Sequence, residues 1–240
     1  MTLAIKDLSV AYGKAPVLKG VNIQFKAGEF YALIGPNGSG KSTLLKAISG
    51  LLPLQNGGIT GLNSDAPRAQ QIAYMSQERM AHPLMRVEDI VALGREPYRH
   101  PFRPLSETDH KFIKSALIRA DVSKMKDALY GTLSGGQKAR VHLARTLAVN
   151  APVLLVDEPV AALDPYYQLS ILTALKNEAA CGRIVIAALH DLSLVQTFAS
   201  QVCIMHEGRL VKTGTPTDAL TSDLLKDVFR VRMIDGQIGL

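Results

Sequence analysis

The stretch Gly35–Thr43 constrains the fold of this chain most, because it combines three glycines with a lysine that two hydroxyl side chains follow directly. Glycines allow backbone angles and close approach that a Cβ atom forbids, so successive N–H groups can point at an anion. Lys41 adds positive charge, and Ser42 is placed to bind Mg²⁺. The stretch therefore predicts a P-loop that binds phosphate through Gly35, Pro36, Asn37, Gly38, Ser39, Gly40, Lys41, Ser42 and Thr43.

The residues on both sides of the loop supply the context that such a motif requires. Phe30–Ile34 reads as a short buried strand, and Ser42–Leu52 carries leucines and isoleucine at helical spacing. The loop thus opens a helix, whose N-terminal dipole faces the same phosphates. A glycine-rich turn without a ligand is the alternative, and the strand–loop–helix order disfavours it.

Two sequence patterns predict strands, alternating polarity and continuous apolar runs. Alternating polarity in Leu3–Tyr12 and Val21–Phe25 indicates antiparallel β structure at the start of the chain. The runs Val153–Val156 and Ile184–Ala188 are entirely apolar, as in strands buried on both faces of a parallel sheet. Ile72–Ser76 is a further strand.

Helical patterns separate these strands. We expect helices at Val87–Leu93, Ser106–Arg119 and Gly135–Val149, the second with Ser106 as its N-cap and Asp109 three residues later. The fold class is therefore α/β: a P-loop NTPase core with a mostly parallel sheet, an N-terminal antiparallel part and an inserted helical subdomain. We predict the core at residues 1–77 and 151–240, and the helical subdomain at 78–150.

Helices and a hairpin are also predicted in the last part of the chain. A helix is expected from Pro165 to a stop at Gly182, a hairpin turn at Gly208 and Arg209, and short helices within Pro216–Phe229.

Two acidic residues end the apolar strand Val153–Val156. In open α/β sheets, ligands collect at the carboxyl ends of strands. Asp157 and Glu158 are these residues, and since successive strand side chains diverge, one carboxylate can serve the magnesium while the other polarises a water toward the γ-phosphate. The alternative, a polar turn before Pro159, is disfavoured beside a P-loop. Ser134, Gly135, Gly136 and Gln137 precede a helix, where they could form a second anion site or simply an N-cap.

Composition narrows the class of protein. The net charge is +6, but the 27 Lys and Arg residues form no polybasic block, which favours solubility and phosphate binding over a nucleic-acid partner. No apolar run approaches the roughly 20 residues that span a bilayer, and the N-terminus has no signal-peptide pattern, so we expect a cytosolic protein. Cys181 and Cys203 lack metal-site or disulfide spacing, and we expect free thiols.

An ordered set of motifs resembles the ATPase subunits of ABC transporters over essentially the whole chain. Gly35–Thr43 looks like the Walker A loop, and Val153–Glu158 looks like the Walker B strand with its glutamate. Leu133–Gln137 resembles the ABC signature, and Ala162–Asp164 resembles the D-loop. Three single residues also match family positions: Gln77 is similar to the Q-loop residue, His190 to the switch histidine and Tyr12 to the adenine-stacking aromatic.

The resemblance implies ATP and Mg²⁺ as cofactors and a head-to-tail homodimer. In that dimer Ser134 reaches the γ-phosphate that Lys41 of the other subunit holds. Glu158 orients the attacking water, His190 contacts the γ-phosphate, and Gln77 joins the magnesium to a membrane partner. The implied catalytic residues are thus Glu158, His190 and Lys41. The metal residues are Ser42, Gln77 and Asp157, and Asp164 also binds the nucleotide.

The substrate class comes from the segment Val87–Pro97 and from the tail that runs from Ala188–Leu192 to Val228–Val231. They are similar to importers of iron siderophores, haem and vitamin B12, which implies ferric-siderophore uptake, a permease pair, an external binding protein and a peripheral place at the cytoplasmic face of the cell membrane. From its residues alone, Val87–Leu93 is only an amphipathic helix that could pack internally. A soluble ABC ATPase without transport, an ABC subunit for another substrate and a P-loop kinase or switch remain alternatives.

Overall fold

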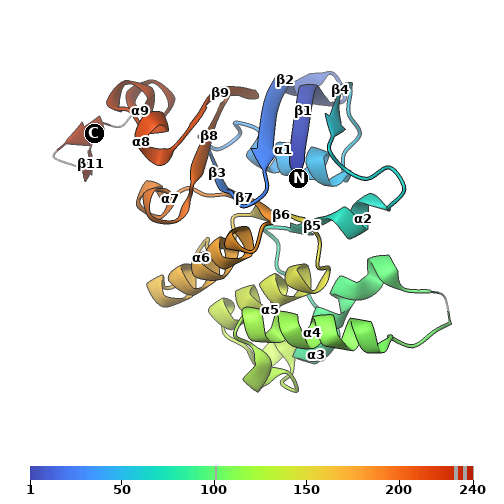
Figure 1. The fold of residues 1–240 in the computed structure, drawn as a ribbon. Helices are drawn as coiled ribbons and strands as arrows, with labels where there is room; N and C mark the ends of the chain where they lie inside the picture. Colours follow the sequence, from blue (N-terminus) through green and yellow to red (C-terminus); the bar gives the residue numbers. More distant parts are fainter. Residues whose placement is uncertain (101, 230–231, 235–236, 240) are drawn as a thin grey trace.

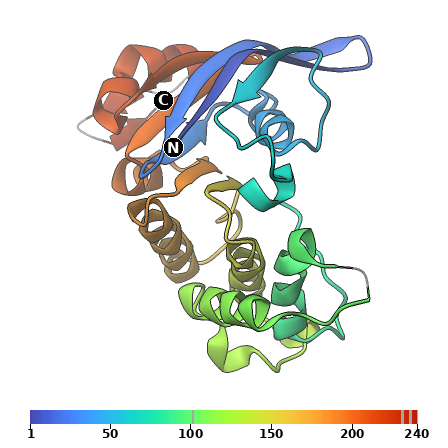
Figure 2. The ribbon, with the colours of Figure 1, turned by 45° about the vertical axis from the view of Figure 1, so that its right-hand side comes forward.

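The computed structural model describes residues 1–100, 102–229, 232–234 and 237–239. Pro101, Arg230 and Val231 lie outside the described residues. The last two residues of the tail that resembles iron importers therefore lie outside the described residues. Figure 1 shows β-sheets in the upper half of the molecule and a group of helices below them, and Figure 2 shows the same separation from another side.

The central sheet has six strands in the order β5-β6-β7-β3-β8-β9. The first five are parallel, and β9 pairs antiparallel with β8. Their bounds are β5 Ile72–Met75, β6 Val153–Asp157, β7 Ile184–Ala188, β3 Phe30–Ile34, β8 Gln201–His206 and β9 Arg209–Gly214. Strands β3, β6 and β7 are buried along their whole length, which confirms the prediction from their apolar runs.

A second, antiparallel sheet has the order β2-β1-β4, with β2 Ala15–Lys26, β1 Thr2–Tyr12 and β4 Asn56–Thr60. The predicted N-terminal antiparallel part is thus confirmed. Helix α1 (Lys41–Ser49) shares one hydrophobic cluster with this sheet and with one face of the central sheet. Its buried aliphatic residues are Leu44, Leu45, Ala47 and Ile48, so packing fixes the helix that the loop opens.

The opposite face of the central sheet packs against helices. Side chains such as Phe30 and Val156 belong to one cluster with residues of α5 (Gly135–Ala148), α6 (Pro165–Ala180) and α7 (Leu192–Phe198). The same cluster continues into α3 (Val87–Ala92) and α4 (Glu107–Arg119), which lie with α5 in the lower part of Figures 1 and 2. The extent of a separate helical subdomain at 78–150 stays a prediction.

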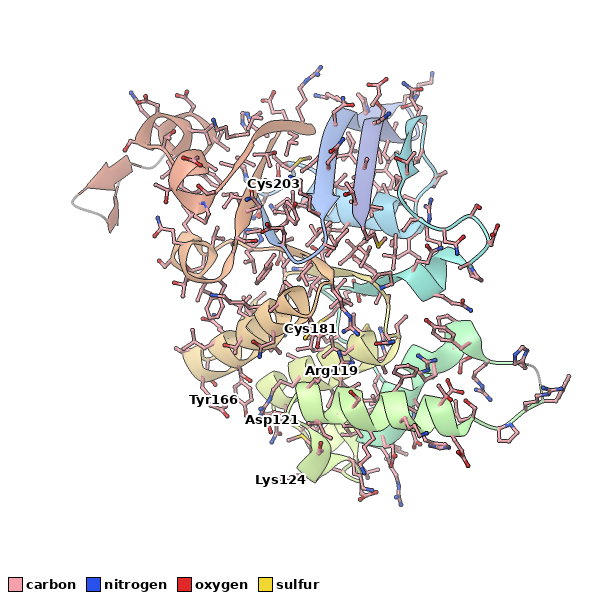
Figure 3. All side chains as sticks on the ribbon, viewed as in Figure 1. Arg119, Asp121, Lys124, Tyr166, Cys181 and Cys203 are labelled. Carbon is pink, nitrogen blue, oxygen red and sulfur yellow. The ribbon has the colours of Figure 1, made fainter. Side chains whose placement is uncertain are left out.

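Several elements differ from the expected ones. Strand β4 and the short helices α2 (Arg68–Gln71) and α7 were not expected, because β4 reads Asn-Gly-Gly-Ile-Thr and the helices are too short for a clear period. Strand β2 starts at Ala15 rather than Val21, since pairing between Ala15 and Tyr12 of β1 extends it. Cys181 and Cys203 are both free thiols, as expected, and Figure 3 shows them in different parts of the molecule.

The remaining elements are short. They are the 3₁₀ turns η1 Leu93–Tyr98, η2 Ser123–Met125 and η3 Tyr130–Thr132, helices α8 Pro216–Ala219 and α9 Ser222–Phe229, and the two-stranded pair β10 Arg232–Ile234 and β11 Gln237–Gly239. In the described ranges, none of the helices has the length and apolar character needed to span a membrane.

Candidate active site

The loop after β3 is shaped by glycines at two tight approaches. A Cβ on Gly35 would overlap the carbonyl oxygen of Met205, and one on Gly40, at φ +102°, would lie 2.8 Å from Leu18 Cδ2. Between them, the Ser39 hydroxyl oxygen is buried and has no hydrogen-bond partner among the described residues. An orphaned polar atom inside a glycine-rich loop fits a phosphate ligand.

Lys41 is the first residue of α1 and is 5% exposed. Its Nζ donates hydrogen bonds to Gly35 O at 2.7 Å and Pro36 O at 3.0 Å. Burial lowers the pKa of Lys41, while the charges of Glu158 and Asp157 oppose that shift. The ammonium group is therefore held by the carbonyl groups of its own loop, close to two carboxylates.

The structure brings the loop and the end of β6 to one cavity of about 330 Å³. Glu158 is the acidic residue that borders it. The other lining residues are Asn37, Gly38, Gly40, Lys41, Ser42 and Thr43, together with Val17 of β2, which the sequence analysis missed. The loop and Glu158 are more than a hundred residues apart in the sequence, and they meet because β3 and β6 lie on either side of β7 in the parallel sheet.

Asp157 is 2% exposed and accepts a hydrogen bond from the Ser42 hydroxyl at 3.0 Å and another from the Tyr74 hydroxyl at 3.2 Å. Burial raises the pKa of Asp157, which these hydrogen bonds partly offset. Burial also raises the pKa of Tyr74, with a further contribution from the Asp157 charge. Hydroxyl and carboxylate oxygens are ligands that Mg²⁺ prefers, so Ser42 and Asp157 fit a magnesium site.

Glu158 turns away from β6 with φ +47°, a left-handed conformation that is strained for a non-glycine residue. Its Oε2 accepts a hydrogen bond from Gln77 Nε2 at 2.7 Å, and its Oε1 lies 2.6 Å from His190 Nε2. Three of the residues named from separate motifs therefore meet at one carboxylate. Glu158 also lines a smaller cavity of about 130 Å³ with His190 and Ala162.

Other predicted site residues lie apart from these cavities. Tyr12 ends β1 with 51% of its surface exposed. Asp164 is exposed at the N-cap position of α6 and makes no capping hydrogen bond. Ser134 and Gln137 form a reciprocal capping box at the start of α5, where Ser134 Oγ accepts from Gln137 N at 3.3 Å and Gln137 Oε1 accepts from Ser134 N at 2.8 Å.

Two contacts near the site were not foreseen. Tyr74 contacts Asp157, as described, and Arg79 Nη2 donates to Glu158 O at 3.0 Å and Pro159 O at 2.7 Å. The position of Arg79 two residues after Gln77 is a weak sequence signal. Nothing local indicates that its side chain reaches the backbone beyond β6, because that contact depends on strand order.

Comparisons with known proteins agree with this arrangement. The family model described as "ABC transporter" matches residues 18–161. The hemin import ATP-binding protein HmuV of Thermobifida fusca (strain YX) is 36% identical over 235 residues, which span 95% of this chain and 82% of that protein. These matches extend well beyond the loop Gly35–Thr43.

Two solved structures have the same fold. An inward-facing transporter assigned to the metal-chelate ABC type has a TM-score of 0.86 at 26% identity, covering 97% of this chain and 90% of that chain. A dimeric post-hydrolysis structure of an ATP-binding cassette bound to ADP and Pi has a TM-score of 0.76 at 28% identity, covering 89% and 98%. The similarity therefore concerns the whole fold.

Proposed function

The chain belongs to the ABC transporter family and is an ATPase of it, and on that basis we propose that it energises import of an iron chelate such as haem or a ferric siderophore. The observation that carries the ATPase assignment is the position of Glu158, which borders the same cavity as Lys41 and Ser42. Likeness to hemin import ATP-binding proteins supports the substrate class.

Nucleotide binding is assigned to the P-loop. The N–H groups of Gly38 and Gly40 and the buried Ser39 hydroxyl surround the phosphates, and the Lys41 ammonium adds charge-assisted hydrogen bonds. Mg²⁺, when held by Ser42 and Asp157, would supply positive charge beside the phosphate oxygens.

Glu158 acts as the base that orients the attacking water and accepts its proton. A carboxylate offers about four lone-pair positions, and the contacts with Gln77 and His190 engage one on each oxygen, so acceptor capacity remains for a water. The same two contacts fix the direction of the carboxylate. His190, 42% exposed at its side chain, is free to turn toward the γ-phosphate during the reaction.

The proposal includes a homodimer and membrane partners. Ser134 and its glycines lie at a helix N-terminus apart from the cavity of their own chain, which suits contact with the nucleotide of a second copy. Permease subunits would bind near Gln77 and Val87–Pro97, and an external binding protein would deliver the chelate. The chain would then work as a peripheral subunit at the cytoplasmic face of the membrane.

The ATPase assignment is tested with Glu158→Gln and, as a matched control, Glu78→Gln at an exposed glutamate next to Gln77 in the sequence. Loss of a general base should lower kcat by about 10²–10⁴-fold, whereas ATP binding is retained and the ATP-bound dimer accumulates. The control should hydrolyse ATP at the rate of the unaltered protein. Near-normal hydrolysis by Glu158→Gln would reject the assignment.

The two-copy site is tested by mixing Ser134→Ala with Lys41→Ala subunits. A mixed dimer has one site in which both residues are intact, so it should recover part of the activity that each variant lacks alone. If no mixture recovers hydrolysis, Ser134 does not complete the site of a partner.

The transport assignment is tested by purifying the tagged chain from detergent-solubilised membranes of its own organism. We expect integral membrane subunits to co-purify, and a strain that lacks the chain to lose growth on haem or on a ferric siderophore as the sole iron source. Recovery of the chain without any membrane subunit would favour an ATPase without a transport role.

A further inference from the structure

The two glycines of the signature segment face different surroundings. A Cβ on Gly135 would meet no atom within 4 Å, whereas a Cβ on Gly136 would overlap the ring of Tyr167. Tyr167 lies in the first turn of α6, three residues after Asp164. The first turns of α5 and α6 therefore approach so closely that a methyl group at residue 136 does not fit between them.

The ring of Tyr167 also faces a buried cation on α5. The Arg140 guanidinium carbon is 4.9 Å from the ring centroid, and Arg140 Nη1 donates to Asp121 Oδ2 at 2.6 Å. Arg140 Nε is buried without a partner among the described residues, so the ring face contributes to stabilising this guanidinium. Tyr166 is 64% exposed, and its ring centroid lies farther from Arg140, at 5.9 Å.

Figure 3 shows how these contacts are arranged. Tyr166 is labelled at the outer end of α6, and Asp121 is labelled just after α4. Arg140 contacts both of them, so it connects the start of α6 with the end of α4.

We propose that Tyr167 is a positioning residue, which seats the N-terminus of α5 against the N-terminus of α6 and thereby fixes Ser134 relative to Asp164. The ring of Tyr167 in the same chain then requires residue 136 to lack a side chain, whatever contact the Gly136 backbone makes with a nucleotide. This inference rests on the proposed function, because Ser134 and Asp164 act at the nucleotide only if two copies of the chain share each site.

The packing part is tested by a double-mutant cycle read as Tm without ATP. Gly136→Ala should lower Tm by about 5 °C, because the added methyl group forces the Tyr167 ring to move. In a Tyr167→Ala background the same change should cost less than about 1 °C. Gly135→Ala, the matched control, should leave Tm unchanged in both backgrounds. An equal loss for Gly136→Ala with and without the Tyr167 ring would overturn the proposal.

The functional part is tested by kinetics. Tyr167→Ala should lower kcat by at least about 10-fold, because Ser134 is misplaced, while ATP affinity measured in EDTA stays within about twofold. Tyr167→Phe keeps the ring and should restore kcat, and Tyr166→Ala should behave as the unaltered protein. Normal kcat for Tyr167→Ala would contradict the positioning role. If the unaltered protein does not hydrolyse ATP, the proposed function fails, and the Tm cycle still decides the packing.

Discussion

A chain of hydrogen bonds connects His142 of helix α5 to the backbone just after β6. The Tyr130 hydroxyl donates to Arg79 O at 2.6 Å and lies 2.9 Å from His142 Nε2, so it accepts from that nitrogen. Arg79 in turn holds the backbone carbonyls of Glu158 and Pro159. The position of the acidic turn therefore depends on side chains from three separate segments.

His142 makes this chain of contacts sensitive to pH. Burial lowers the pKa of His142 to about 4, with smaller contributions from the charges of Arg145 and Arg79. The unfolded state, with a histidine pKa near 6.5, thus binds more protons than the folded state between pH 6.5 and 4. We expect the free energy of unfolding to fall by up to about 3 kcal/mol as the pH drops through this window.

Denaturant unfolding at several pH values checks this expectation. His142→Gln should flatten the slope of stability against pH. Tyr130→Phe, the control, should lower stability at every pH and keep the slope, because burial is the main cause of the shift. A slope that survives His142→Gln would assign the pH dependence to other groups.

Helix α4 illustrates how an element is fixed at its start. Ser106 and Asp109 form the expected capping box, and Arg95 Nε donates to Asp109 Oδ1 at 2.8 Å. Burial raises the pKa of Asp109, but hydrogen bonds from Ser106 and Arg95 outweigh it and hold the pKa at about 2. Arg95 also donates to the carbonyl groups of Ala148 and Val149, so one guanidinium joins the start of α4 to the end of α5.

Removing the cap should destabilise the protein measurably. Ser106→Ala leaves the backbone N–H of Asp109 without its acceptor, which costs about 1 kcal/mol. We expect Tm to fall by about 2–4 °C in a thermal unfolding scan. Ser64→Ala, in an exposed turn, should change Tm by less than this. An unchanged Tm for Ser106→Ala would mean that Arg95 and Asp109 hold the helix start unaided.

At the scale of the whole molecule, Glu178 ties the helical group to the sheet. Its carboxylate accepts from Arg119 Nη1 at 2.8 Å on each oxygen, and it also pairs with Arg183 just before β7. Arg119 Nη2 further donates to Leu147 O at 3.0 Å. Arg119 is the last residue of α4, and Figure 3 labels it beside Cys181, which follows α6. Burial lowers the pKa of Arg119, and the Glu178 charge opposes that shift.

Loss of this carboxylate should be among the more damaging single changes. Glu178→Ala leaves two partly buried guanidinium groups unpaired, which costs about 3 kcal/mol or more in the free energy of unfolding. Denaturant titration of Glu178→Ala and of the unaltered protein measures this loss in the free energy of unfolding. Asp127→Asn, which breaks the exposed pair with Arg86, should cost less than about 1 kcal/mol. Similar losses for both variants would show that Glu178 has no special role in joining the helices to the sheet.

The sequence by itself determined those features that neighbouring residues encode. Strands β3 and β7 have the predicted bounds, because a run of apolar residues between polar ones is a local pattern. The capping box of α4 and the glycine-rich loop were also readable, since each needs particular residue types at fixed spacing. Gln77 and His190, by contrast, were named only through the resemblance to ABC ATPases, because a lone polar residue at a strand end has no local signature of its own.

Only the tertiary structure decided which distant residues meet. Strand order brings Gln77 and His190 to Glu158 and carries Arg79 to the backbone beyond it. The contact between Tyr167 and Gly136 has no local signature either. Such contacts depend on how whole elements pack, and burial in that packing, rather than residue type, lowers the pKa of a histidine or makes a glycine necessary.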